Sequence, residues 1–175
     1  MVQHKVLNWH QALHAPPRIS SSTSHDDMLF WAILLTGFYA LMRLSKLVSS
    51  NREALRDYRK IVCRSSMHIT PSSFDFYLPG HKADHLFQGN HVLLERVNTL
   101  DDPYTPFTCY LRSHYFLFPY HAELWLRADG TIPTQGWFMR RLHHHFPTSD
   151  VAGHSLRSGG ATAMAEAGVP LHLIQ

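Results

Sequence analysis

The chain has 175 residues, of which 45% are hydrophobic and only 17% charged, a balance that favours one packed domain over disorder. Sixteen Lys and Arg residues against thirteen Asp and Glu give a formal charge of +3, which permits contact with phosphate groups without requiring it. Two cysteines rule out a disulfide framework and fit a reducing intracellular setting. The longest apolar run, residues 29–42, is shorter than the roughly 20 residues of a membrane span, so we expect a soluble intracellular chain without membrane contact.

The N-terminal part of the chain divides at about residue 24. Residues 1–24 have weak hydrophobic patterning and contain a Pro pair followed by a Ser-rich stretch, which predicts a linker or N-terminal tail. Ser24 and Asp27 form a Ser-x-x-Asp helix-start signal, and the apolar run that follows predicts a buried core helix to about Met42. We therefore assign the folded domain to residues 25–175.

Short apolar segments follow in the middle of the chain. Residues 67–70, 74–78 and 92–94 are segments of this kind, and turn-forming residues separate them. The turn between the last two begins at Pro79-Gly80. This pattern predicts a small antiparallel sheet.

The C-terminal half is predicted to be mainly helical. Helices are expected over residues 107–118, 134–145 and 155–167, with a short strand at Leu124–Leu126. Gly168 is expected to close the last helix. The predicted fold class is therefore α+β, mainly α with a small antiparallel β-sheet inserted early.

The most informative motif lies in residues 153–162. His154 and Arg157 are three residues apart at the predicted start of the last helix, so their side chains share one face. Free backbone N–H groups and the helix dipole favour an anion at that end. Gly159 and Gly160 leave the helix without bulk, so another backbone or a DNA strand can approach closely. On spacing alone, a capped helix with a surface arginine and a half-buried histidine is the alternative.

The stretch His154-Ser155-Leu156-Arg157 resembles the second signature of the tyrosine recombinase (phage-integrase-like) family. Within the family, the sequence most resembles eukaryotic mobile-element recombinases of the Crypton and related groups. The resemblance covers about residues 26–175. It implies a function in DNA recombination and DNA integration.

Two upstream positions extend the resemblance. Residues 36–47 are similar to the family's first signature and put Arg43 in its arginine position, with Lys46 where the family usually has an acidic residue. Lys82, in the turn between two predicted strands, is similar to the family's hairpin lysine. The resemblance therefore implies a phosphate pocket of Arg43, Lys82, His154 and Arg157.

The chemistry that the family performs would follow from these side chains. A Tyr hydroxyl attacks phosphorus, which gives a 3′-phosphotyrosyl link and a free 5′-hydroxyl. Arg43 and Arg157 would clamp the non-bridging oxygens and stabilise the growing charge. Lys82 would protonate the leaving 5′-oxygen, and His154 would hydrogen-bond the phosphate. No metal or cofactor is implied, because guanidinium groups take the place of the cation.

The nucleophile that the resemblance implies is not in this sequence. In the family it follows the His-x-x-Arg helix, whereas all seven tyrosines here precede His154. We therefore expect a truncated recombinase catalytic domain, incomplete at the C-terminus and inactive alone. Double-stranded DNA is the expected partner, with self-association on DNA, and the nucleus is the expected location if the source is eukaryotic.

A second basic region is expected on the helix over residues 134–145. Arg140, Arg141 and Thr134 are predicted to contact the phosphate backbone, with a solvated helix face as the alternative. The run His143-His144-His145 raises a zinc-binding alternative, but three consecutive histidines cannot all face one metal from a helix. A non-catalytic DNA-binding or interaction module derived from a recombinase is the third possibility.

Overall fold

The computed structural model describes residues 24–80, 89–98, 102–147 and 155–166, with Gly168 and Pro170. Residues 1–23, which hold most of the predicted tail, lie outside this part. The helices and strands are α2 (His25–Tyr39), β1 (His68–Ile69), β2 (Ser73–Leu78), β3 (Asn90–Glu95), α3 (Tyr104–Leu117), α4 (Gln135–His145) and α5 (Ser155–Glu166). Four 3₁₀ turns lie between α2 and β1, namely η2 (Leu44–Lys46), η3 (Glu53–Leu55), η4 (Tyr58–Lys60) and η5 (Arg64–Ser66). The predicted α+β class is confirmed.

The three strands form the predicted antiparallel sheet in the order β1-β2-β3. Phe74 pairs with Leu94 and Phe76 with Val92. Phe74, Phe76 and Leu94 are buried, so this face of the sheet packs on the core.

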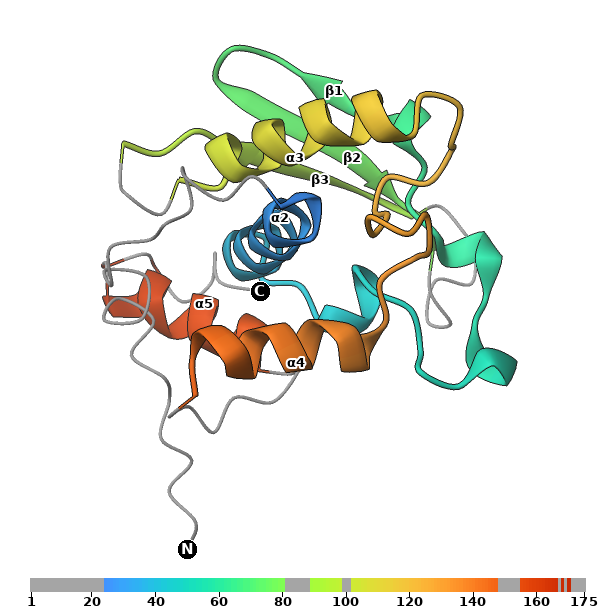
Figure 1. The fold of residues 1–175 in the computed structure, drawn as a ribbon. Helices are drawn as coiled ribbons and strands as arrows, with labels where there is room; N and C mark the ends of the chain where they lie inside the picture. The colour runs from blue at the N-terminus through green and yellow to red at the C-terminus, as the bar shows by residue number, and fades with distance from the viewer. Residues whose placement is uncertain are drawn as a thin grey trace, which may run out of the picture.

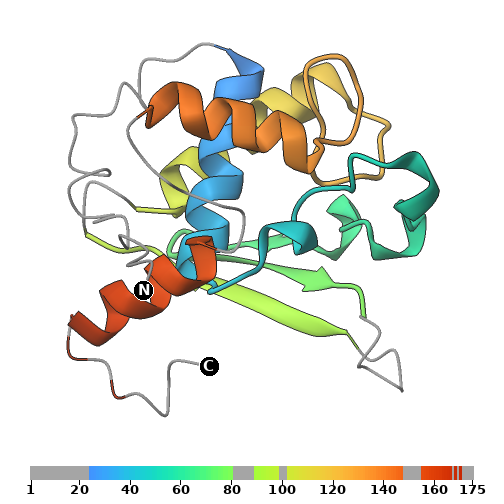
Figure 2. The ribbon, with the colours of Figure 1, turned by 90° about the horizontal axis from the view of Figure 1, so that it is seen from below.

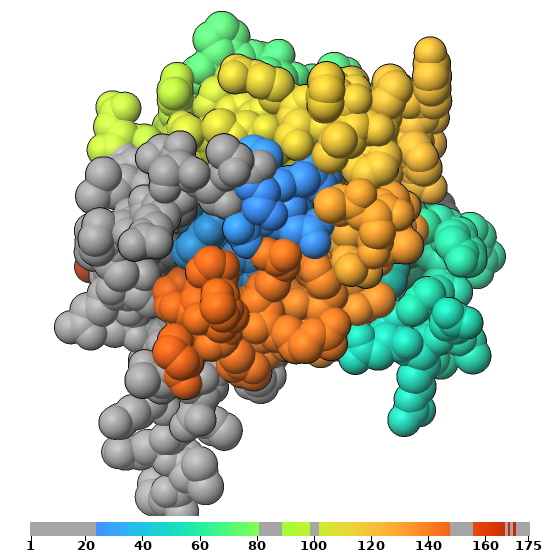
Figure 3. All heavy atoms as spheres, in the orientation of Figure 1, coloured from blue at the N-terminus to red at the C-terminus, as the bar shows by residue number. Residues whose placement is uncertain are grey.

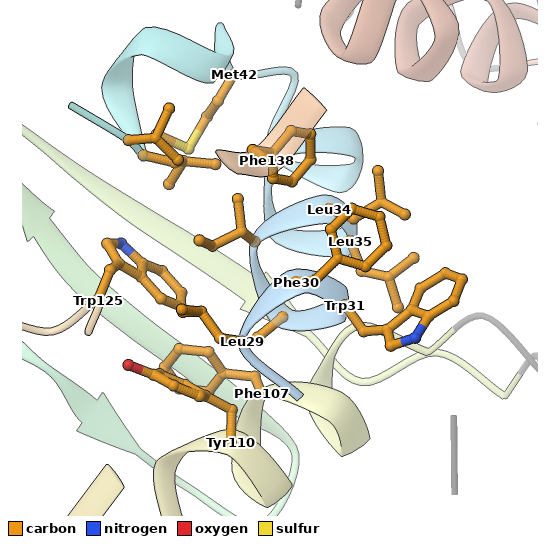
Figure 4. Close-up of a cluster of buried hydrophobic side chains, with 14 of the residues drawn as sticks. Leu29, Phe30, Trp31, Leu34, Leu35, Met42, Phe107, Tyr110, Trp125 and Phe138 are labelled. Carbon is orange, nitrogen blue, oxygen red and sulfur yellow. The ribbon is translucent and has the colours of Figure 1, made fainter. Parts of the chain in front are cut away.

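Helix α2 runs through the middle of the molecule. Figure 1 shows α3 and the sheet on one side of it and α4 on the other, and Figure 2 shows α4 crossing over α2 from below. Every residue from Leu29 to Phe38 is buried, which confirms the predicted core helix. Figure 4 shows that side chains leave α2 in several directions. Phe138 of α4 lies on one side of the helix and Tyr110 of α3 on the other.

Helix α2 ends three residues earlier than predicted, because the chain turns sharply at Leu41. The Leu41 N–H donates to the Phe38 carbonyl and the Met42 N–H to the Gly37 carbonyl, which is the bonding pattern of a Schellman motif. This motif needs a left-handed residue, usually Gly, and here Leu41 adopts it with φ 51°. A left-handed Leu costs about 1–2 kcal/mol, so the neighbouring contacts must hold the turn.

The predicted helix start at Ser24 is correct, but its predicted capping bond is absent. Ser24 is the N-cap residue, and its side chain makes no capping hydrogen bond. The nearby acids have other partners. Asp26 accepts from the Ala128 N–H at 2.7 Å, and both Asp26 and Asp27 bind the Arg141 guanidinium. These contacts attach α4 to the N-terminal end of α2.

Helix α3 begins earlier than predicted because its proline fits the first turn. The Tyr104 and Thr105 N–H groups donate to the Asp102 carboxylate, which caps the helix. Pro106 then stands at the third helical position, where a missing N–H breaks no intrahelical bond.

The strand predicted at Leu124–Leu126 does not form. The Leu124 N–H donates to the Val62 carbonyl, and the Leu126 N–H donates to the buried Tyr110 hydroxyl. Only Cys63 and Glu123 form an isolated bridge there. A buried tyrosine side chain therefore takes the place of a neighbouring strand.

His114 is fully buried on α3 and is held as a neutral ring. Its Nε2 lies 3.0 Å from the Glu123 carbonyl, so Nε2 carries the proton, and Nδ1 lies 3.4 Å from the Arg64 guanidinium. Burial is the main reason that the pKa of His114 is lowered to about 4 from the usual 6.5; the bond to the Glu123 carbonyl opposes this shift, and the Arg64 charge adds to it.

None of the helices in the described ranges is long and apolar enough to cross a bilayer.

Acidification should destabilise the protein through His114. Because the folded pKa lies below the unfolded one, the unfolded chain binds the proton first, and stability should fall from pH 6.5 to about pH 4. One such proton contributes a slope of up to about 1.4 kcal/mol per pH unit. Urea midpoints at pH 7.5, 6.0 and 4.5 measure this slope.

His114→Gln should flatten the slope, since glutamine can still donate to the Glu123 carbonyl without titrating. His143→Gln, at an exposed position on α4, is the matched control and should leave the slope unchanged. Equal slopes in the wild type and His114→Gln would contradict the assignment.

Candidate nucleic-acid interface

Arg157 is presented to solvent by the first turns of α5. Leu156, Gly159 and Gly160 are buried, whereas Arg157 and Ser158 are exposed. The small residues predicted to permit close approach therefore face the protein, and the arginine faces outward. What approaches the glycines is the protein's own backbone.

The close contact is between Gly160 and the end of α2. A Cβ atom at Gly160 would lie 2.3 Å from the Phe38 carbonyl oxygen and 2.8 Å from Leu41. A second close contact lies one turn earlier in α5, at Gly37 of α2. A Cβ atom at Gly37 would lie 3.2 Å from a methyl of Leu156 and 3.1 Å from a methyl of Leu47. Helix α5 is therefore fixed against α2 and the turn that follows it.

This packing brings the two predicted arginines to the same part of the molecule. Arg43 is exposed and precedes η2, between Leu41, which contacts Gly160, and Leu47, which packs beside Leu156. Figure 2 shows α5 crossing the end of α2 where the chain turns into η2. Arg43 and Arg157 thus come from two exposed segments that pack directly on each other.

Lys82 and His154 lie outside the described residues. The elements next to them in sequence are nonetheless the predicted strands and the predicted helix. Lys82 follows β2 in a segment that ends before β3, and His154 immediately precedes α5.

Lys46 has cations around it instead of an acidic partner. Burial, then the charges on Lys60 and Arg43, lower its pKa. In the described ranges, no hydrogen bond or ion pair joins the side chain of Lys46 or Arg43 to an acid. Lys60 is not among the predicted site residues, although the dense charge of residues 52–60 is a usable signal in the sequence.

The predicted basic face of α4 is partly used in structural contacts. Arg140 is exposed. Arg141 pairs with Asp26 and Asp27, and its guanidinium lies 5.1 Å from the Trp137 ring centroid. The Thr134 hydroxyl accepts from the Trp137 N–H and caps α4. Of the three predicted DNA-binding residues on α4, Arg140 is thus the one that faces solvent and makes neither an ion pair nor a helix cap in the described ranges.

The histidine run on α4 does not gather around one point. His145 stacks on Phe30 with ring centroids 5.0 Å apart, whereas His143 and His144 are exposed. Within the described ranges, no group of three or more His, Cys, Asp or Glu side chains could hold a metal ion.

The tyrosines differ sharply in accessibility. Burial raises the pKa of Tyr110, and its hydroxyl is bonded to the backbone of Leu124 and Leu126. Tyr115 and Tyr120, at and beyond the end of α3, have exposed fractions of 47% and 97%.

No protein-family model matches this sequence, and no curated protein matches it. A solved structure of the XerH site-specific recombinase, bound to its difH substrate in a pre-cleavage complex, matches with a TM-score of 0.59 and 12% identity. The match covers the whole of this chain and 45% of the recombinase chain, so this chain spans less than half of that protein's length. The fold is therefore similar to that of a site-specific recombinase.

Gly160→Ala should destabilise the protein by about 1–3 kcal/mol, despite the higher helix propensity of alanine. The added methyl would meet a backbone carbonyl, which cannot rotate away as a side chain can. Thermal unfolding measures the effect. Arg157→Ala on the exposed face of α5 is the control and should leave the melting temperature unchanged. A Gly160→Ala protein as stable as the wild type would show that α5 does not pack here.

Proposed function

We propose that this chain is a DNA-binding part of a tyrosine recombinase catalytic domain, in which Arg43 and Arg157 bind the scissile phosphate. Lys82 and His154 complete the proposed pocket. The proposal extends to a eukaryotic mobile-element origin of the Crypton type, with action in the nucleus and self-association on DNA.

The main support is the packing of α5 on the end of α2. It puts the exposed Arg43 and Arg157 on adjoining segments, although 113 positions separate them in sequence. Two guanidinium groups on adjoining segments are suited to a phosphate, since each can donate two parallel hydrogen bonds. The similarity of fold to a recombinase that was solved on DNA adds a second, weaker support.

The proposed reaction is a transfer of phosphorus between two oxygens. The Tyr hydroxyl loses its proton as its oxygen bonds phosphorus, and the bond from phosphorus to the 5′-oxygen breaks. Lys82 gives a proton to that leaving oxygen, a contribution worth roughly 10²–10⁴ in rate. Arg43 and Arg157 stabilise the charge on the non-bridging oxygens throughout.

We propose that the nucleophile comes from outside these 175 residues. No Tyr follows Arg157 in this sequence, and Tyr110 is buried and bonded to backbone. We therefore propose that the chain as given binds DNA without cleaving it.

A non-catalytic DNA-binding module is the second candidate. Lys46 favours it, because a cation there leaves Arg43 without the acidic support that the family provides, in the part of the chain that the structure describes.

The chain alone should form no covalent adduct with a nicked suicide DNA substrate. A chimera that adds a C-terminal segment from a related recombinase, with its Tyr, should form a 3′-phosphotyrosyl adduct. A denaturing gel with labelled DNA detects it. In the chimera, Arg157→Ala should slow adduct formation by about 10²–10³-fold, because one donor to the developing charge is lost.

Ser155→Ala in the same chimera is the control and should leave the rate unchanged. An adduct from the unextended chain would show that the nucleophile is misassigned, with Tyr115 or Tyr120 as the first residues to replace. A chimera that folds and binds DNA without reacting would favour the non-catalytic module.

A further inference from the structure

The positive charge of the protein is concentrated in one short segment. Residues 43–60 contain six of the sixteen Lys and Arg residues and only two of the thirteen Asp and Glu, so they carry a formal +4 and the rest of the chain −1. Figure 3 shows that the later part of this segment, in teal, stands out from the body of the molecule. Residues 43–60 are therefore a strongly basic segment.

The two acids of this segment are already engaged. Asp57 accepts from Arg59 at 2.9 and 3.1 Å, and these hydrogen bonds lower its pKa to about 2. Lys60 lies 3.4 Å from the same carboxylate, and Glu53 pairs with Arg56. Lys46 therefore meets no spare negative charge in the described part of the segment.

A pocket of about 90 Å³ lies among these cations. Lys46, Arg56 and Lys60 line it together with three serines, Ser45, Ser49 and Ser50, and with the engaged Asp57. A cavity of this volume has room for the oxygens of one phosphate group, since about 10–15 Å³ of such space already holds a water molecule. Three cations and three hydroxyls around so small a space favour an anion.

The apolar wall of the same pocket includes Trp125, a buried residue whose indole N–H also lacks an acceptor in the described ranges. Figure 4 shows its nitrogen on the side of the ring away from Tyr110. A buried donor without a partner costs about 1–3 kcal/mol, so the region has spare donors in addition to spare positive charge.

The basic segment also borders a larger hollow of about 630 Å³ on its other side. Lys60, Arg59 and Tyr58 line one wall, and Tyr77 and Gly80 line another. Gly80 is the last described residue before the segment that contains Lys82. Residues 58–60 thus lie across this hollow from the end of β2.

We propose that residues 46–60 form a second phosphate-binding surface in addition to the pocket of Arg43 and Arg157, and that Lys46 and Lys60 bind a backbone phosphate of duplex DNA there. This inference rests on the proposed function. It gives Lys46 a role that differs from the acidic residue the family has there, since Lys46 would bind DNA directly instead of supporting Arg43. It also adds a DNA contact to the one predicted for α4.

The test is a duplex titration between 50 and 200 mM salt with Lys46→Gln and Lys60→Gln. Each lost phosphate contact should make the slope of log K against log salt shallower by about 0.9. The affinity advantage of the wild type over either variant should therefore shrink roughly 3.5-fold across this range. Lys46→Arg should keep the wild-type slope, which shows that the charge is what counts.

Arg112→Gln makes the same charge change at an exposed position on α3 and should keep the wild-type slope. Wild-type slopes in both Lys46→Gln and Lys60→Gln would overturn the proposal, even if inorganic phosphate raised the melting temperature, because the pocket would then serve the free ion. Failure of the wild-type chain to bind duplex at 50 mM salt would contradict the proposed function itself, and this inference with it.

Discussion

Burial of α2 on all sides is the constraint on which the rest of this structure depends. Its middle has no polar face, so other elements must cover it in every direction. Helix α3 and the sheet, α4 and α5 provide this cover. The candidate site depends on the contact of α5 with α2, which is closest where Gly160 meets the Phe38 carbonyl.

The sequence predicts elements well where a local signal decides them. Thr134 fixes the start of α4, and the turn after Leu78 separates two strands. It predicts poorly where a distant side chain decides. No local pattern shows that the Tyr110 hydroxyl binds the backbone at Leu126, or that Leu41 is held in a left-handed turn. Both results depend on tertiary contacts, which no sequence window contains.

The candidate site also combines features that the local sequence predicts with features that depend on tertiary contacts. His154-x-x-Arg157 and Arg43 are recognisable as motifs, and the packing of α5 on the end of α2 puts the segments that carry Arg157 and Arg43 against each other. The partners of the charged groups are a tertiary property. Arg141 is basic in sequence but neutralised by Asp26 and Asp27, whereas Lys46 is surrounded by other cations. Counting charges does not reveal which of them remain available.

The uneven charge also affects how the protein approaches other molecules. The formal charge is +4 on residues 43–60 and −1 on the rest of the chain. Near a polyanion, the electrostatic field would attract the basic segment before any contact forms, which would raise the rate of productive encounters. This attraction acts within a Debye length of about 8 Å at physiological salt. Residues 43–60 would therefore set the direction of arrival as well as the strength of binding.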